Sequence, residues 1–133
     1  IMENNQQELI FKLSMFEQQI QQLQQQLQAV EQSMVEMNSL NLGLDEIKGA
    51  KGKEIFAQIG RGIFAKTKLL SEDLTVDIGG KNLVKKTVPE TKKLIEEQIN
   101  KLKDVQGNLN SNMDQISGEL QKTLIEAQKQ EKK

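Results

Sequence analysis

The chain has 133 residues, the length of one domain, but only 36% of them are hydrophobic and 3% aromatic, which leaves no sizeable globular core and no aromatic platform for stacking nucleic-acid bases. The net charge of -1 also removes the electrostatic attraction on which nucleic-acid binding depends. Cysteine and histidine are both absent, which excludes disulfides, thiolate nucleophiles and imidazole metal ligands and makes an enzyme or a cofactor-binding protein the least expected class.

The first predicted element, residues 1–44, is a long amphipathic helix. From Leu9 onward, apolar residues recur at alternating steps of four and three, with one polar interruption at Asn41. This spacing keeps a single apolar stripe facing a partner helix and is the sequence condition for a left-handed coiled coil. We call this stripe the first seam; it consists of Leu9, Leu13, Phe16, Ile20, Leu23, Leu27, Val30, Met34, Met37, Asn41 and Leu44.

The middle segment, residues 45–88, predicts β-structure and is the basic part of the chain. Gly43, Gly49 and Gly52 are expected to end the first helix, and four short apolar runs follow at residues 55–59, 63–69, 74–78 and 83–88. Glycine-containing turns between the first two runs and between the last two predict two β-hairpins. An isolated hairpin is marginal in water, so we expect the segment to be an assembly platform that pairs with sheets of other chains. Its expected apolar contacts are Ile55, Phe56, Ile59, Ile63, Phe64, Leu74, Val76, Ile78, Leu83 and Val84.

The last predicted element, residues 89–133, is a second long helix with a seam of its own. Two starts are equally compatible with the sequence: a capping box formed by Thr87 and Glu90, or Pro89 at the first helical position. The same 4-3 stepping runs from Ile95 to Ala127. The second seam consists of Ile95, Ile99, Leu102, Gln106, Leu109, Met113, Ile116, Leu120, Thr123 and Ala127.

The two seams match in length and register if the helices are antiparallel. Pairs such as Leu13 with Leu120 and Val30 with Leu102 keep a near-constant sum of position numbers, and Asn41 is expected opposite Lys92 as one of a few polar layers that fix the pairing. We therefore predict an α+β fold, mostly α, in a single domain 1–133: a long antiparallel two-helix coiled coil joined at one end by two β-hairpins. Both termini are expected at the other end.

Several apolar residues near the two termini are not used by the seams. Ile10, Phe11 and Met15 lie beside the first seam, and Leu124 and Ile125 lie beside the second. Apolar surface left exposed at the end of a rod usually marks an interaction site, although these side chains could also widen the seam or meet a neighbouring chain. The candidate binding residues at this end are Leu9, Ile10, Phe11, Leu13, Leu120, Leu124 and Ile125.

The central stretch carries a family resemblance. The sequence EIFAQIGRGIFAK at residues 54–66 is similar to the strand, glycine turn and second strand of the prefoldin family, and LTVDIGG at residues 74–80 is similar to its apolar strand that ends in glycine. With a long helix on either side, the whole chain resembles a prefoldin subunit of the archaeal type. Two hairpins rather than one favour the α class over the β class.

The resemblance implies an ATP-independent molecular chaperone. Such a subunit is expected to join prefoldin β-class subunits in a hexamer of two α and four β chains, to bind unfolded polypeptides at its coiled-coil tips, and to deliver them to a group II chaperonin. A filament-forming scaffold and a coiled-coil adaptor for one specific partner remain the alternatives. Without a membrane-spanning run, a basic signal sequence or any cysteine, we expect a protein of the cytoplasm with no cofactor, no nucleic-acid partner and no membrane partner.

Overall fold

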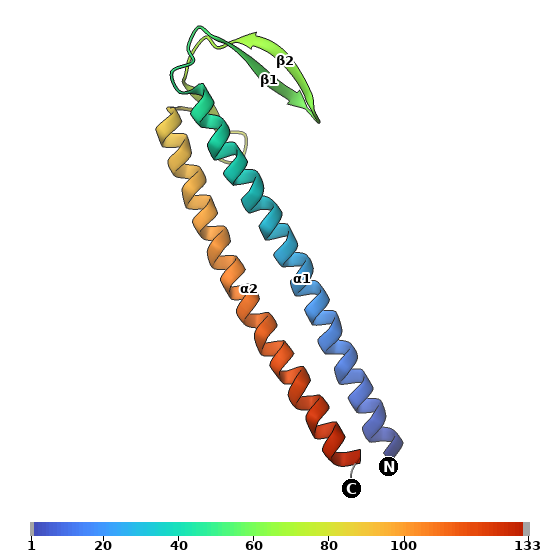
Figure 1. Ribbon diagram of the computed structural model, residues 1–133. Coiled ribbons are helices and arrows are strands. Elements are labelled where there is room, and N and C mark those ends of the chain that lie inside the picture. The colour runs from blue at the N-terminus through green and yellow to red at the C-terminus, as the bar shows by residue number, and fades with distance from the viewer. Residues whose placement is uncertain (1, 132–133) are drawn as a thin grey trace. The chain divides into compact units, whose positions relative to one another are not determined.

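The structure, a computed structural model, describes residues 2–131 of the chain and the side chains of residues 4–130. Along the chain, two long helices flank four short strands, and the strands form two separate antiparallel hairpins. Figure 1 shows both helices and the first hairpin. The predicted fold class is therefore confirmed. In chain order the elements are α1 (Met2–Ile47), β1 (Glu54–Gly60), β2 (Ile63–Lys68), β3 (Leu74–Asp77), β4 (Leu83–Lys86) and α2 (Val88–Glu131).

The chain divides into two compact units, and each contains a part of both helices. The first unit combines α1 up to Ser33 with α2 from Leu102, and the second is Met34–Lys101 with both hairpins. In the first unit, residues 5–12 line one groove together with residues 123–130, and residues 19–26 line another with residues 112–119. The two helices are therefore antiparallel in this unit, as predicted.

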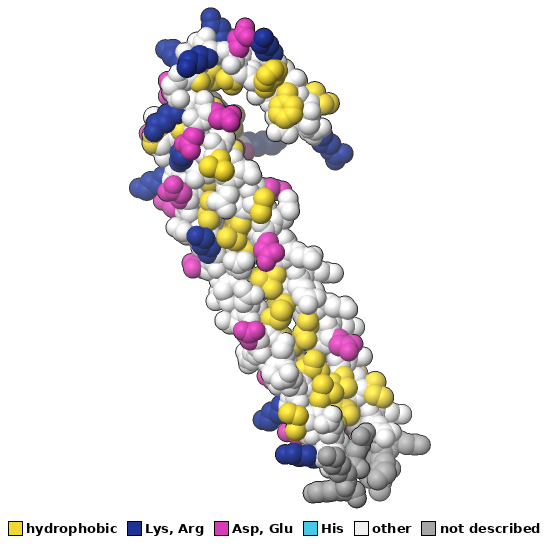
Figure 2. Space-filling model, viewed as in Figure 1, with side chains coloured by type: hydrophobic (Ala, Val, Ile, Leu, Met, Phe, Trp, Pro, Cys, Tyr) yellow, Lys and Arg dark blue, Asp and Glu magenta, His cyan; other side chains and the backbone are white. Residues whose placement is uncertain are grey.

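The seams are buried where the 4-3 spacing places them. Each residue of the first and second seams is half-buried or buried, while most of the intervening helix positions are exposed. The polar seam members Asn41, Gln106 and Thr123 are half-buried like their apolar neighbours. Figure 2 shows the resulting row of hydrophobic side chains along the helices. Burial of this row is what holds the helices together, because an isolated helix gains little stability from propensity alone.

The most buried residues lie in the second unit. Leu44, Val88, Ile95 and Ile99 form its hydrophobic core, and Met37, Ile47 and Leu74 pack against them. Lys92 of α2 also makes an ion pair with Asp45 of α1, one helical turn along from Asn41. Each fully buried aliphatic side chain stabilises the fold by roughly 1.5–3 kcal/mol. This core thus fixes the point where the helices meet β3.

Helix α1 continues three residues past the predicted end at Leu44. Gly43 lies inside the helix at an exposed position, where glycine is tolerated at a modest cost. The helix ends at Ile47, whose carbonyl accepts a hydrogen bond from the Ala50 amide at 3.0 Å, and Gly49 takes a positive φ of 77°. Gly49 is therefore the residue that stops α1, because it adopts the left-handed conformation typical of a helix C-terminus.

The hydrogen bonds at the start of α2 show which of the two predicted N-terminal arrangements the helix adopts. The Thr87 Oγ1 accepts a hydrogen bond from the Glu90 amide at 3.2 Å, and the Thr87 carbonyl accepts one from the Thr91 amide at 3.0 Å. Thr87 is thus the N-cap, and Pro89 occupies the second helical position rather than the first. The prediction that the last strand reaches Val88 was wrong: β4 ends at Lys86, and Val88 is the first residue of α2 and a core residue.

Candidate interaction surfaces

The β1–β2 hairpin is closed by a tight two-residue turn. Strand pairing runs from Glu54 opposite Lys68 to Gly60 opposite Ile63, with a β-bulge at Ile59. Arg61 and Gly62, the two turn residues, have positive φ values of 33° and 78°, as a type I′ turn requires. The amides of Gly52 and Leu69 extend the ladder beyond the strands by hydrogen bonds of 2.7 and 2.9 Å.

The two faces of this hairpin differ in chemistry. Side chains alternate between faces along a strand, so Ile55 and Ala57 share a face with their cross-strand neighbours Thr67 and Ala65. We call this the neutral face, because it carries no charge; it consists of Ile55, Ala57, Ile63, Ala65 and Thr67. The opposite, aromatic face consists of Glu54, Phe56, Gln58, Phe64, Lys66 and Lys68.

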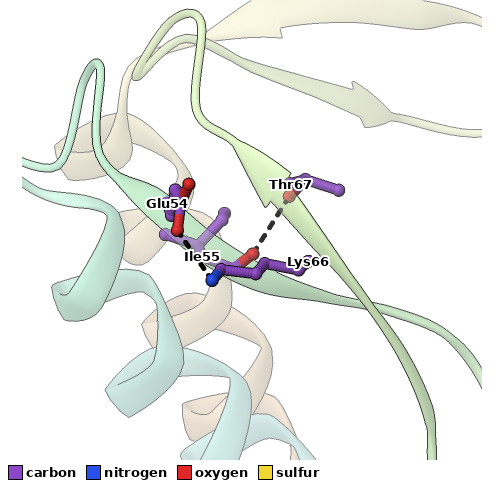
Figure 3. A network of polar contacts seen from close by, with 4 residues as sticks. All are labelled: Glu54, Ile55, Lys66 and Thr67. Atoms are coloured by element: carbon purple, nitrogen blue, oxygen red, sulfur yellow. Dashed lines mark hydrogen bonds and ion pairs between the residues drawn. The ribbon is translucent and has the colours of Figure 1, made fainter.

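Polar contacts lie at the base of the hairpin on both faces (Figure 3). On the aromatic face, Lys66 and Glu54 form an ion pair at 3.0 Å between side chains that are largely exposed. On the neutral face, the Thr67 hydroxyl donates a hydrogen bond to the Ile55 carbonyl at 3.2 Å. An exposed ion pair of this kind contributes little to stability. The Phe side chains, rather than these contacts, are the prominent feature of the aromatic face.

The β3–β4 hairpin packs on the hydrophobic core of the helices through Leu74, whereas no residue of the β1–β2 hairpin belongs to that core. Leu74 of β3 packs on the helical core, and Val76 and Val84, which are paired across the strands, are half-buried on the same face. Ile78 and Leu83, close to the turn, are exposed. Gly79 and Asn82 close that turn, with the Asn82 amide donating to the Gly79 carbonyl at 3.1 Å.

The residues predicted to act in assembly therefore divide into two groups. Half-buried residues are Ile55, Leu74, Val76 and Val84, and exposed residues are Phe56, Ile59, Ile63, Phe64, Ile78 and Leu83. The exposed group is large for a segment of this length. Exposed apolar side chains on short two-stranded sheets indicate a surface that a partner covers.

The candidate residues near the termini likewise divide into two groups. Leu9, Leu13 and Leu120 belong to the seams and are half-buried. The other four, Ile10, Phe11, Leu124 and Ile125, are exposed, with Phe11 66% accessible to solvent. We call these four residues the terminal patch.

The terminal patch lies on one flank of the first unit. Ile10 directly follows the seam residue Leu9, and Leu124 directly follows the seam residue Thr123. In an antiparallel pair, residues that follow equivalent seam positions lie on the same side of the interface. Phe11 and Ile125 are one step further round the same side of each helix. The four side chains therefore extend the seam sideways into solvent.

Three exposed apolar residues of α1, Val35, Leu40 and Leu42, escaped the sequence analysis, and two of them share one side of the helix. Val35 and Leu42 lie seven residues apart, so they occupy the same side of the helix two turns from each other. Both are exposed, and Leu42 is 71% accessible to solvent. We call this pair the helix stripe. In the sequence the pair shows only as two apolar residues seven positions apart outside the seam, which is too short a pattern to predict a surface.

The grooves between the helices offer little for a small ligand. The larger groove of the first unit, about 420 Å³, is lined mostly by amide side chains, together with Leu23 and Ile116. Among the described residues, no cluster of acidic side chains is placed to hold a metal ion. No described helix is both long and apolar enough to cross a membrane. The surfaces that stand out are thus apolar patches, and exposed apolar patches usually mark interaction sites.

Comparison with known proteins points to one family. The family model described as "Prefoldin subunit" matches residues 16–133. Prefoldin subunit alpha of Methanobrevibacter smithii is 32% identical over 111 residues, which cover 83% of this chain and 76% of that protein. Prefoldin subunit alpha of Methanosphaera stadtmanae is 29% identical over 89 residues, which cover 67% of this chain and 64% of that protein.

A solved structure has the same fold. A chain of the filamentous PFD from Methanocaldococcus jannaschii, determined by cryo-EM, superposes with a TM-score of 0.75. The match covers 86% of this chain and 97% of that one at 17% sequence identity. The similarity therefore concerns the arrangement of helices and hairpins.

Proposed function

This chain belongs to the prefoldin family as an α-type subunit, and from that premise we propose that its terminal patch holds unfolded polypeptides. The observation that carries the proposal is the exposure of Ile10, Phe11, Leu124 and Ile125 on one flank of the antiparallel helices. An unfolded chain displays apolar side chains, and contact with the patch removes both surfaces from water. Neither a nucleotide nor a metal is needed for such binding.

Weak contacts suit this task. Each exposed aliphatic or aromatic side chain of the patch offers at most about 1–3 kcal/mol on full burial. After the entropic cost of association, four such residues hold a client only loosely. Several subunits that act together raise the overall affinity through effective concentration, while each single contact remains quick to break. The arrangement thus favours capture followed by transfer, which in this proposal is transfer to a group II chaperonin.

Assembly is the second part of the proposal. We infer that the two hairpins join hairpins of β-class prefoldin subunits, in a hexamer with two copies of this chain. The neutral face of β1–β2 supports this assignment, because a face without charge is suited to the interior of a closed sheet. The exposed residues Ile78 and Leu83 of the second hairpin supply further apolar area.

Native mass spectrometry tests the assembly. The chain is measured alone and then mixed with a β-class subunit. A hexamer with two copies of this chain, present only in the mixture, supports the proposal. A ladder of ever larger species from the chain alone would instead indicate a filament, and a small oligomer unchanged by the β-class subunit would indicate an adaptor.

Client capture is tested by polar substitution of the terminal patch. A variant with Ile10→Ser, Phe11→Ser, Leu124→Ser and Ile125→Ser is assembled and compared with the unaltered complex for suppression of aggregation of a denatured model protein. We expect most of the suppression to be lost while the native mass of the complex is unchanged. The matched control carries Leu40→Ser and Val105→Ser, which remove exposed apolar side chains elsewhere on the same helices. Equal suppression by the patch variant and the control would refute the assignment.

A further inference from the structure

The aromatic face of the first hairpin presents an unusual combination of side chains. Phe56 is 72% exposed, and Phe64, its diagonal neighbour across the strands, is exposed as well. Lys66 and Lys68 flank them on β2. If the neutral face lies inside an assembled sheet, the aromatic face points outward, because side chains alternate across the pleat. Two Phe rings then remain uncovered after assembly, beside Lys68 and the Lys66–Glu54 ion pair.

The helix stripe presents the complementary combination. Val35 and Leu42 are uncovered, and Asp45 and Glu46 lie three and four residues after Leu42, next to it on the helix surface. Every charged residue between Lys12 and Lys48 is acidic. Asp45 is already paired with Lys92, so the acidic side chain that this narrow apolar surface offers to a partner is Glu46. Both surfaces belong to the same compact unit of the chain.

From this complementarity we infer that the aromatic face of one chain docks on the helix stripe of a second copy. The Phe56 and Phe64 rings would cover Val35 and Leu42, and Lys68 would approach Glu46. Aromatic anchors in the centre of a contact with charged pairs at its rim are typical of protein interfaces. Opposite charges at the rim select the partner and orient it more than they add affinity.

A second copy is the occupant that fits best, because one chain carries both members of the complementary pair. Two copies can exchange hairpins reciprocally, and the same contact then occurs twice around a twofold axis. Within a single chain both surfaces stay exposed, so the chain does not satisfy them by itself. The inference rests on the proposed function in one step only, the burial of the neutral face by assembly.

Disulfide trapping between full-length chains tests the contact. Because the sequence contains no cysteine, only the introduced thiols can form a disulfide. A Leu42→Cys chain is mixed with a Phe64→Cys chain under mild oxidation, and the mixed dimer is quantified by intact mass. The control partner is Leu40→Cys, because Leu40 is 51% exposed on the same helix but two residues away, about 200° round the axis. We expect the Leu42→Cys mixture to give about tenfold more mixed dimer, since docking raises the effective concentration of the two thiols.

Equal yields with Leu42→Cys and Leu40→Cys would overturn the inference. A chain that carries both Leu42→Cys and Phe64→Cys and closes a disulfide only within itself would overturn the assignment to a second copy. Charge reversal supplies an independent measurement: Lys68→Glu in the Phe64→Cys chain, or Glu46→Lys in the Leu42→Cys chain, should lower the trapped yield. The two reversals together should restore it, and failure to do so would contradict the docking pose. None of these outcomes depends on hexamer formation or client capture, so the two proposals fail separately.

Discussion

Truncation of one seam leucine in each compact unit should have different costs. Leu23 and Leu44 occupy the same heptad position of α1 and differ in their surroundings. Leu44 is 6% exposed and belongs to the hydrophobic core of the second unit. Leu23 is half-buried and borders the open groove of the first unit. The pair Leu44→Ala and Leu23→Ala therefore compares the same chemical change in a closed and an open site.

The expected magnitudes follow from the burial. Each substitution removes three carbon atoms, and at about 0.8 kcal/mol per buried methylene the transfer term alone is about 2.4 kcal/mol for a buried leucine. At Leu44 the cavity left behind raises the cost to about 3 kcal/mol. At Leu23 water already reaches the side chain, so we expect about 1–2 kcal/mol. The surface control Leu40→Ala should stay within about 0.5 kcal/mol of the unaltered chain.

Urea denaturation followed by helical circular dichroism measures these differences, at one chain concentration for all variants. The predicted order of destabilisation is Leu44→Ala, then Leu23→Ala, then Leu40→Ala. Equal costs at Leu44 and Leu23, or a greater cost at Leu23, would show that the core around Val88 and Ile99 does not make the second unit the more tightly packed one.

Three further substitutions test particular features of the structure. Thr87→Ala removes the N-cap of α2 and should lower the free energy of unfolding by about 1 kcal/mol, with Thr87→Ser close to unchanged; a neutral Thr87→Ala would contradict the cap. The Asn41 Oδ1 is buried without a hydrogen-bond partner in the described part of the chain, so Asn41→Leu should stabilise the seam by about 1–3 kcal/mol while it weakens the selection of one register; a loss of stability in urea would contradict this. Gly62→Ala should destabilise the β1–β2 turn by about 1–2 kcal/mol, because Gly62 has a positive φ, and faster hydrogen exchange confined to β1 and β2 is the expected result.

The helical part of the fold was accessible from the sequence because the coiled coil repeats its signal. Every heptad places apolar residues on the same side of the helix. The pattern therefore remains recognisable although single seam positions, such as Asn41 and Gln106, are polar. The ends of elements carry no such redundancy. Gly43 suggested a helix end, but α1 continues past it to Ile47 because Leu44 and Ile47 pack in the core, and Gly49 follows the true end. Valine is common in strands, so the sequence assigned Val88 to the last strand. In the structure Val88 is buried in the core and is the first residue of α2.

The interaction surfaces were predicted less completely. The sequence placed Phe11 and Ile125 beside the seams, but their exposure depends on how far the partner helix covers each flank, which spacing alone does not give. Similarly, alternation along β1 and β2 predicts two faces, but the bulge at Ile59 and the pairing of Phe64 with Gln58 decide which side chains share a face. The helix stripe was missed because two residues are too few for a periodic signal.

Site-specific photo-cross-linking to an unfolded client tests the central claim most directly. A photoreactive amino acid replaces Phe11 or Ile125 in one set of assembled complexes and Leu40 in another, and each is irradiated with a denatured model protein. The account predicts client adducts from the Phe11 and Ile125 positions and few from Leu40, although all three side chains are exposed. Adducts that form equally from Leu40, or that are missing from both positions of the terminal patch, would contradict the claim that this patch holds the client.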